Sequence, residues 1–151
     1  MLEPADRRVL AALQADARLT NAELAERAGL SASACWRRVR ALEAAGVIRG
    51  YGARLDAAAC GLGFQAIVHV QLARHAASDV DAFIAAIRGR AEVRDCYAVT
   101  GEADYHLRVV CADLAAYNAF LDGFVFRLPG LAHARTNLVL KEIKAEGGLP
   151  I

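Results

Sequence analysis

The arginines between residues 27 and 54 are the side chains of this chain best suited to chemistry with a polyanion. This segment holds six arginines and one acid, Glu43, in a chain whose formal net charge is only +1. On a helical wheel of about 100° per residue, Arg37 and Arg40 fall on the side opposite the apolar residues of the same segment. Guanidinium groups spaced in this way suit phosphate contacts and bidentate hydrogen bonds to guanine. A single basic segment in a nearly neutral chain predicts a localised nucleic-acid-binding patch.

A second group of polar residues lies in the sequence V-T-G-E-A-D-Y, residues 99–105. Gly101 permits a tight turn whose exposed backbone N–H groups can hold a carboxylate, and Glu102 or Asp104 can hold an ammonium group. Together these groups suit a free amino acid. A plain hairpin turn is the alternative, and the residues alone favour it, because Gly and Asp are common turn formers.

Other chemistries find less support. His69 and His106, on neighbouring expected strands, suggest a metal or acid–base pair, but no third ligand or carboxylate accompanies them, so interface histidines are the better interpretation. The four cysteines form no C-x-x-C pair, which argues against structural zinc and a disulfide framework; three of them are expected to be small buried thiols. Without a Ser-His-Asp order or a phosphate-binding glycine loop, we expect neither an enzyme nor a cofactor or metal.

Two short amphipathic helices are expected in residues 20–48, and the second carries the arginines of the patch. Thr20, with Glu23 three residues later, predicts a capping box. Gly29 predicts the turn between the helices, and Ser31 predicts the cap of a second helix that runs to about Ala45. A helix-turn-helix of this kind is typical of DNA-binding proteins, although a three-helix bundle with a solvated basic face remains the alternative.

The flanking segments complete a first domain of residues 1–55. Asp6 is expected to cap a preceding helix whose apolar residues recur at helical spacing. The sequence from Val47 to Leu55 predicts two short extended pieces around glycines, a small wing on which Arg49 and Arg54 can reach the DNA backbone. Residues 56–63, which end in Gly-Leu-Gly, are expected to form a hinge.

Residues 64–151 change to the alternating pattern of strands and predict a β-α-β-β-α-β order, a ferredoxin-like domain. Its helices are expected to be capped by Ser78 and Asp113, the second one to stop at residues 129–130, and the last strand to run from about His133 to Glu142. Both helices must cover one face of the sheet. The other face, with His69, Gln71, His106 and Arg108 beside Ile67 and Val110, is expected to pair with another sheet. The chain is therefore predicted to be an α+β protein.

Residues 11–51 carry the run A-x-L-x-x-x-x-R-L-T-N-A-E-L-A-E-R-A-G-L-S-x-S-x-C-x-R-R-V-x-x-L-E-x-x-G-V-I-x-G-Y. This run resembles the Lrp/AsnC, or feast/famine, family of transcriptional regulators, and the similarity continues over nearly the whole chain. In that family the second helix of the motif reads the major groove, a role that the resemblance implies for Ser31, Ser33, Trp36, Arg37 and Arg40. It also implies an effector site in the turn, at Thr100, Gly101, Glu102, Asp104 and Tyr105, with Thr136 on the last strand. Glu102 stands where Asp is frequent in the family.

The resulting expectation is a cytoplasmic transcription regulator that binds double-stranded DNA at a palindromic site and responds to an amino acid. The resemblance implies a homodimer that assembles further to a tetramer or octamer. No apolar run approaches the ~20 residues that cross a bilayer, and the first residues lack the features of a signal peptide. The alternative is an architectural DNA-binding protein without effector control. Affinity for its own upstream DNA, compared with unrelated DNA at fixed salt, would separate the two.

Overall fold

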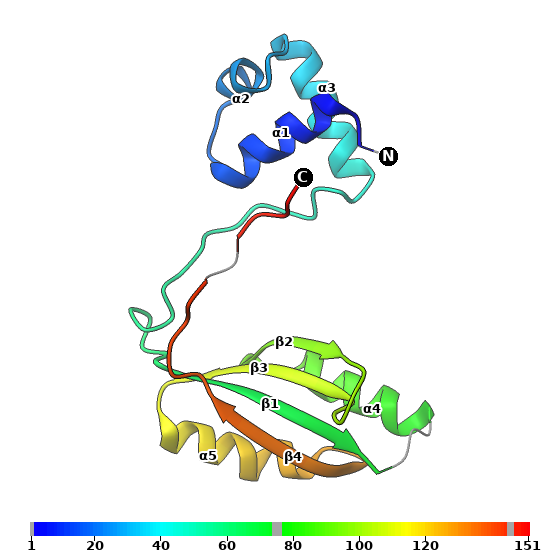
Figure 1. Ribbon diagram of the computed structural model, residues 1–151, viewed down its shortest axis with the longest axis vertical. Coiled ribbons are helices and arrows are strands. Elements are labelled where there is room, and N and C mark those ends of the chain that lie inside the picture. The colour runs from blue at the N-terminus through cyan, green and yellow to red at the C-terminus, as the bar shows by residue number, and fades with distance from the viewer. Residues whose placement is uncertain (1, 74–76, 145–146) are drawn as a thin grey trace. The chain divides into compact units, whose positions relative to one another are not determined.

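The computed structural model describes residues 2–73, 77–144 and 147–151 (Figure 1). The chain divides into two compact units, one made of Met1–Ala53 with Ile143–Ile151 and the other of Arg54–Glu142. The segment expected as a hinge, residues 56–63, begins with a folded turn in which the Leu62 N–H donates to the Ala57 carbonyl at 2.8 Å. The last residues, expected with the sheet, belong to the first unit.

Three helices form the first unit: α1 (Pro4–Ala15), α2 (Asn21–Ala28) and α3 (Ala32–Ala44). One stripe of each helix is apolar, and these stripes meet in a small core. Its buried members are Val9, Leu10, Leu24, Ala25, Ala28, Cys35 and Leu42. Small residues on α2 allow the helices to approach closely.

Local signals at the helix ends explain where α2 and α3 begin and stop. The Thr20 hydroxyl accepts from the Glu23 N–H at 3.3 Å, and the Glu23 carboxylate accepts from the Thr20 N–H at 2.8 Å, which confirms the expected capping box. Gly29 adopts the left-handed conformation, with φ of 64°, that ends α2. The Asp6 prediction was wrong in position: Pro4 starts α1 earlier, Glu3 is the N-cap, and Asp6 is the third helical residue.

The segment after α3 departs from the expected wing. Residues 47–55 form no β-ladder with the residues that the structure describes, although the Val47 and Ile48 N–H groups donate to the Leu42 carbonyl. Gly50 and Gly52 lower the strand propensity of this segment, and a lone short hairpin is marginal. In the same unit, the Gln14 side chain holds the C-terminal tail by accepting from the Leu149 N–H and donating to its carbonyl.

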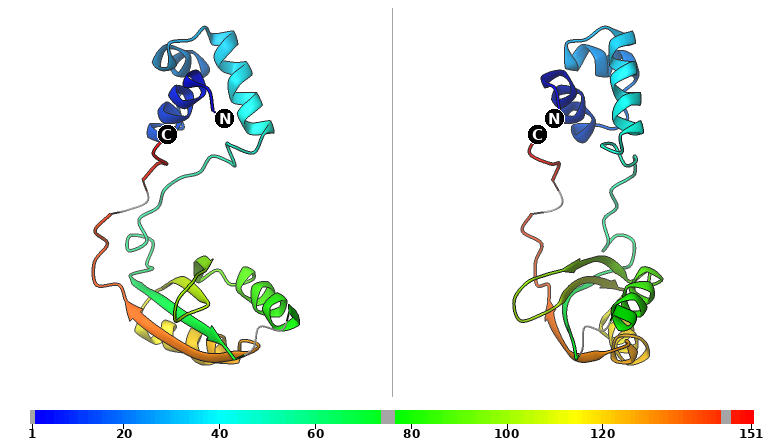
Figure 2. Two further views of the ribbon diagram at one scale, coloured as in Figure 1. Left: turned by 45° about the vertical axis from the view of Figure 1, so that its right-hand side comes forward. Right: turned by 90° about the vertical axis from the view of Figure 1, so that its right-hand side faces the viewer.

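The second unit is a four-stranded antiparallel sheet with two helices. Its elements are β1 (Phe64–Leu72), α4 (Ala77–Arg88), β2 (Val93–Ala98), β3 (Tyr105–Cys111), α5 (Leu114–Gly123), the 3-10 turn Val125–Arg127 and β4 (Leu131–Leu138). The strand order is β2-β3-β1-β4, and both helices lie against the same face (Figure 2). This arrangement confirms the ferredoxin-like prediction.

Strand alternation separates the two faces of this sheet. Ala66, Val68 and Val70 of β1 are fully buried beneath α4 and α5, together with Leu107 and Val109 of β3. The alternate residues of these strands, which are half-buried or exposed apart from the buried Val110, form the helix-free face of the sheet, called here the open face.

Several boundaries differ from the sequence prediction. Ser78 lies inside α4, which begins at Ala77; residues 74–76 are outside the described part of the chain. The strand β4 begins at Leu131 and ends at Leu138, earlier at both ends than expected, and α5 ends at Gly123 before a 3-10 turn. Only Cys35 and Cys111 are buried, whereas Cys60 and Cys96 are exposed. None of the described helices is long and apolar enough to span a membrane.

Candidate nucleic-acid interface and effector pocket

The start of α3 is fixed by two serine hydroxyls. The Ser31 hydroxyl accepts from the Ala34 N–H at 3.3 Å and so caps the helix, because that N–H has no intrahelical partner. Its oxygen lies 3.3 Å from the Ser33 hydroxyl oxygen. Both serines are exposed, so the N-terminal turn of α3 presents two hydroxyl groups to a ligand.

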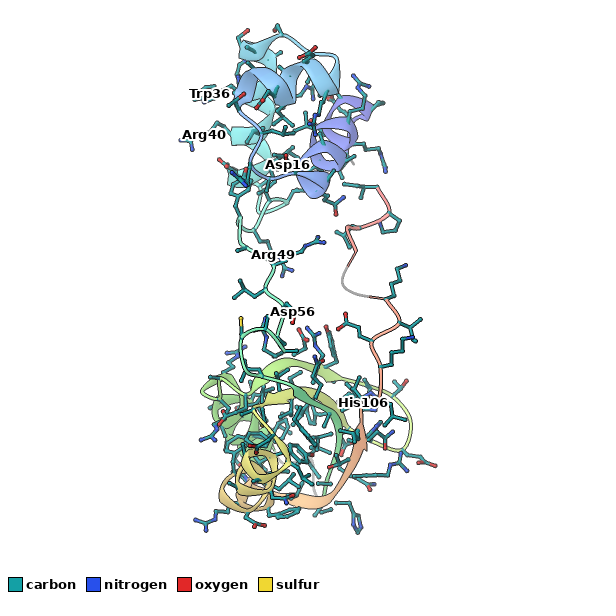
Figure 3. All side chains as sticks on the ribbon, turned by 90° about the vertical axis from the view of Figure 1, so that its left-hand side faces the viewer. Asp16, Trp36, Arg40, Arg49, Asp56 and His106 are labelled. Atoms are coloured by element: carbon teal, nitrogen blue, oxygen red, sulfur yellow. The ribbon has the colours of Figure 1, made fainter. Side chains whose placement is uncertain are left out.

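The solvent-facing side of α3 presents one aromatic and two cationic side chains. Trp36 is 56% exposed, and Arg37 and Arg40 are exposed as well, whereas Cys35 and Leu42 are buried on the other side. Trp36 and Arg40 point to the same side of the helix (Figure 3), and the Arg40 guanidinium carbon lies 5.9 Å from the centre of the indole ring. This face can meet phosphates and base edges.

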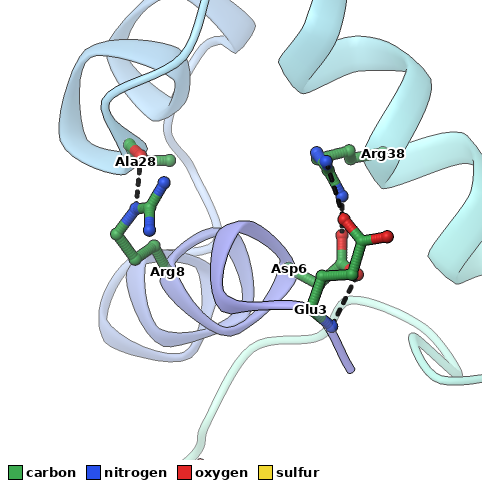
Figure 4. A network of polar contacts seen from close by, with 5 residues as sticks. All are labelled: Glu3, Asp6, Arg8, Ala28 and Arg38. Atoms are coloured by element: carbon green, nitrogen blue, oxygen red, sulfur yellow. Dashed lines mark hydrogen bonds and ion pairs between the residues drawn. The ribbon is translucent and has the colours of Figure 1, made fainter. Parts of the chain in front are cut away.

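Arg38 has a different environment from its neighbour Arg37. Its guanidinium lies 2.7 Å from an Asp6 carboxylate oxygen and 3.0 Å from a Glu3 oxygen, both at the start of α1 (Figure 4). Hydrogen bonds to Asp6, and then to Glu3, raise the pKa of Arg38. We therefore count Arg38 as a link between α3 and α1, and the basic patch has one fewer arginine than the sequence indicated.

The two arginines expected on the wing belong to different units. Arg49 lies in the first unit with α3, and Arg54 begins the second unit. Both side chains are exposed. Of the two, only Arg49 therefore shares a compact unit with α3.

The turn between β2 and β3 is held by the backbone and by Asp104. The Val99 N–H donates to the Asp104 carbonyl, and the Asp104 N–H donates to the Val70 carbonyl, each at 2.9 Å. The Asp104 carboxylate accepts from the Leu72 N–H at 2.7 Å. Thr100, Gly101 and Glu102 remain exposed, and Gly101 has a φ of 115°. Asp104 thus anchors the turn to β1 and leaves the turn's tip available.

A pocket of about 180 Å³ opens beside this turn on the open face of the sheet. The Arg135 guanidinium lies 3.7 Å from the Glu102 carboxylate, so the pocket carries one cation and one anion. The residues that line the pocket are His69, Gln71, Glu102, Ala103, His133 and Arg135. Of these six residues, only Glu102 belongs to the site expected from the sequence. The pairing of β1 with β4 places Arg135 opposite His69 and His133 opposite Gln71, and the sequence alone does not show this pairing.

Two residues expected in the effector site lie on the helix-covered side of the sheet. The Tyr105 ring packs 4.4 Å from the Phe83 ring of α4. The Thr136 hydroxyl lies 2.6 Å from the Tyr117 hydroxyl of α5. The structure therefore does not bring Tyr105 and Thr136 to the pocket that Glu102 lines.

The two histidines on the open face contact each other. Nδ1 of His69 lies 2.9 Å from Nε2 of His106, and the rings meet edge to face. Burial, and then the charges of His106 and Arg135, lower the pKa of His69. No group of three or more metal-ligating side chains occurs among the described residues.

Two family models match the chain, and together they cover both units. A winged helix-turn-helix DNA-binding model matches residues 2–49, and an Lrp/AsnC ligand binding domain model matches residues 65–149. The second match alone covers more than half of the chain.

Individual proteins agree with these matches. The leucine-responsive regulatory protein of Salmonella typhimurium is 37% identical over 99% of this chain and 92% of its own length. A transcriptional regulator from Neisseria meningitidis, solved as a complex with L-Met, is 40% identical with a TM-score of 0.93, over 99% of this chain and 97% of that one. An AsnC family regulator from Agrobacterium tumefaciens is 33% identical, with the same TM-score and coverage.

Proposed function

The chain belongs to the Lrp/AsnC family of DNA-binding transcriptional regulators, and we propose that it reads DNA with α3 and responds to an amino acid bound on its sheet unit. The observation that supports DNA reading by α3 is that its three arginines have different environments. Arg37 and Arg40 are exposed beside Trp36, whereas Arg38 forms an ion pair with Asp6 of α1. Ser31 and Ser33 at the start of the helix join these contacts, and Arg49 and Arg54 supply backbone contacts.

Substitution of Arg37 or Arg40 by Ala tests the DNA-reading face. If either arginine reads a guanine edge, its loss costs about 1–3 kcal/mol of binding and relaxes specificity at one position. The measurement is the affinity of the full chain for its own upstream DNA at fixed salt. Arg88→Ala, which removes an equal charge from the end of α4, is the matched control. Unchanged affinity in both α3 variants would contradict the assignment.

The effector proposal rests on the charged pocket beside the turn at residues 99–105. Glu102 and Arg135 offer an anion and a cation 3.7 Å apart, which suits the ammonium and carboxylate of an amino acid. The Neisseria relative was solved with L-Met, which favours an amino acid. Thr100 and Gly101 lie in the same turn and can add contacts. Asp104 holds the turn in place, and Tyr105 and Thr136 support the sheet from its other face.

Thermal unfolding against a panel of amino acids tests this site. A ligand that binds only the folded chain stabilises it by about 2.7 kcal/mol at a hundredfold excess over Kd. Gly101→Arg should abolish the shift while DNA binding persists, because a long cationic side chain at the tip of the turn can reach the neighbouring Glu102 carboxylate and compete with the ligand's ammonium. Gly101→Ala is the control, since it shares the backbone strain of a residue at φ of 115° without the bulk. If an amino acid still raised the unfolding temperature of Gly101→Arg by the normal amount, the effector would have to bind elsewhere.

A further inference from the structure

The first unit contains a groove that borders the proposed DNA-reading face of α3, with which it shares Trp36 and Arg40, and that is separate from the effector pocket. It has a volume of about 300 Å³ and lies among α1, α2, α3 and the residue Tyr51. This volume is at the lower end of the range for small-molecule sites. We call it the Trp36 groove, because Trp36 lines it and is the only tryptophan of the chain.

The groove combines apolar surface with one charge of each sign. Leu13 of α1 and Leu24 of α2 supply aliphatic surface, and Trp36 and Tyr51, 56% and 53% exposed, supply aromatic surface. Exposed aromatic side chains beside a concave apolar surface are typical of binding sites. The apolar part therefore suits an aliphatic or aromatic side chain of a ligand.

Arg40 and Glu43 supply the charges. Their closest atoms lie 3.4 Å apart, a contact between the exposed Arg40 and the half-buried Glu43 that is long for an ion pair and can open for a ligand. The Tyr51 hydroxyl donates to the other Glu43 oxygen at 3.0 Å and so fixes the carboxylate at the groove. A ligand that carries both an ammonium and a carboxylate matches this pair.

We propose that the Trp36 groove is a second ligand site that takes a free amino acid with an apolar side chain. The ammonium binds Glu43, the carboxylate binds Arg40, and the side chain lies against Leu13, Leu24 and Trp36. Arg40 then serves either the ligand or DNA, so occupancy of the groove and DNA binding oppose each other reciprocally. This site is separate from the pocket at Glu102, and either can exist without the other.

Tryptophan fluorescence of the full chain during a titration with L-leucine tests the proposal, since Trp36 is the only tryptophan. We expect a saturable change that N-acetyl-L-leucine and L-leucinamide, each lacking one charge, fail to produce. Glu43→Gln should weaken the response at least tenfold, whereas Glu26→Gln, on an exposed position of α2, should leave it intact. A response that survives Glu43→Gln, or that both singly charged analogues reproduce, overturns the proposal.

Glu102→Gln separates the two sites. In this variant we expect the fluorescence response to persist and saturating L-leucine to lower DNA affinity. A response lost in Glu102→Gln but kept in Glu43→Gln would mean that Trp36 reports the effector pocket, and the groove proposal fails. A thermal shift with L-leucine and no fluorescence change would also overturn it, while leaving the effector pocket supported.

Discussion

At the scale of single residues, the His69–His106 contact defines a protonation state. Nε2 of His69 is buried and has no hydrogen-bond partner among the described residues. A buried lone pair without a partner costs less than a buried N–H without one, so we assign the proton of neutral His69 to Nδ1, which donates to Nε2 of His106. Protonation of His69 would create an unpaired buried N–H next to His106 and Arg135.

Acid should therefore destabilise this face of the sheet. Because burial lowers the pKa of His69, the unfolded chain binds the proton more readily, and the free energy of unfolding falls as the pH drops below about 6.5. His69→Gln keeps a hydrogen-bonding side chain without this titration and should show a smaller loss between about pH 7 and about pH 5. Urea unfolding at one protein concentration measures both chains; equal losses would contradict the prediction.

At the scale of elements, the roles of the arginines on α3 can be predicted only partly from the sequence. The helical wheel correctly placed Arg37 and Arg40 opposite the core, because helix periodicity is a local property. It could not show that Arg38 reaches Glu3 and Asp6, since that contact depends on how α1 packs against α3. The same limit applies to the pocket at Glu102, where Arg135 comes from a strand paired across the sheet.

Substitutions of Arg37 and Arg38 should consequently have different effects, the first on DNA binding and the second on thermal stability. Arg38→Ala leaves the carboxylate of Asp6, with a side chain only 16% exposed, without its cation, and should lower the thermal midpoint. Arg37→Ala removes an exposed side chain and should weaken DNA binding without that loss. Thermal unfolding and DNA affinity, measured on both variants, check this. Arg38→Lys should recover part of the stability, and a stable Arg38→Ala chain would contradict the role of the link.

At the scale of the whole molecule, the open face of the sheet bears on assembly. It mixes Ile67 and Val110 with the two histidines and with Arg108, which donates to Asp95 at 2.5 Å. The βαββαβ order was predictable from alternation, and with it the existence of this face. Pairing of this face with another sheet was also expected, but one chain alone does not show the register in which two copies would meet. We propose that a second copy of the chain covers it in a homodimer, which can assemble further.

Ile67→Asp tests this assembly. The half-buried isoleucine lies in the middle strand pair of the face, opposite Arg108 on β3 and Asn137 on β4. A carboxylate placed there must be desolvated when two faces meet, so the variant should shift toward the monomer. Sedimentation equilibrium of the full chain measures the mass. Leu114→Asp, the same change at an exposed position of α5, should leave the mass unchanged. A dimer that persists in Ile67→Asp would mean that the subunits meet through another surface.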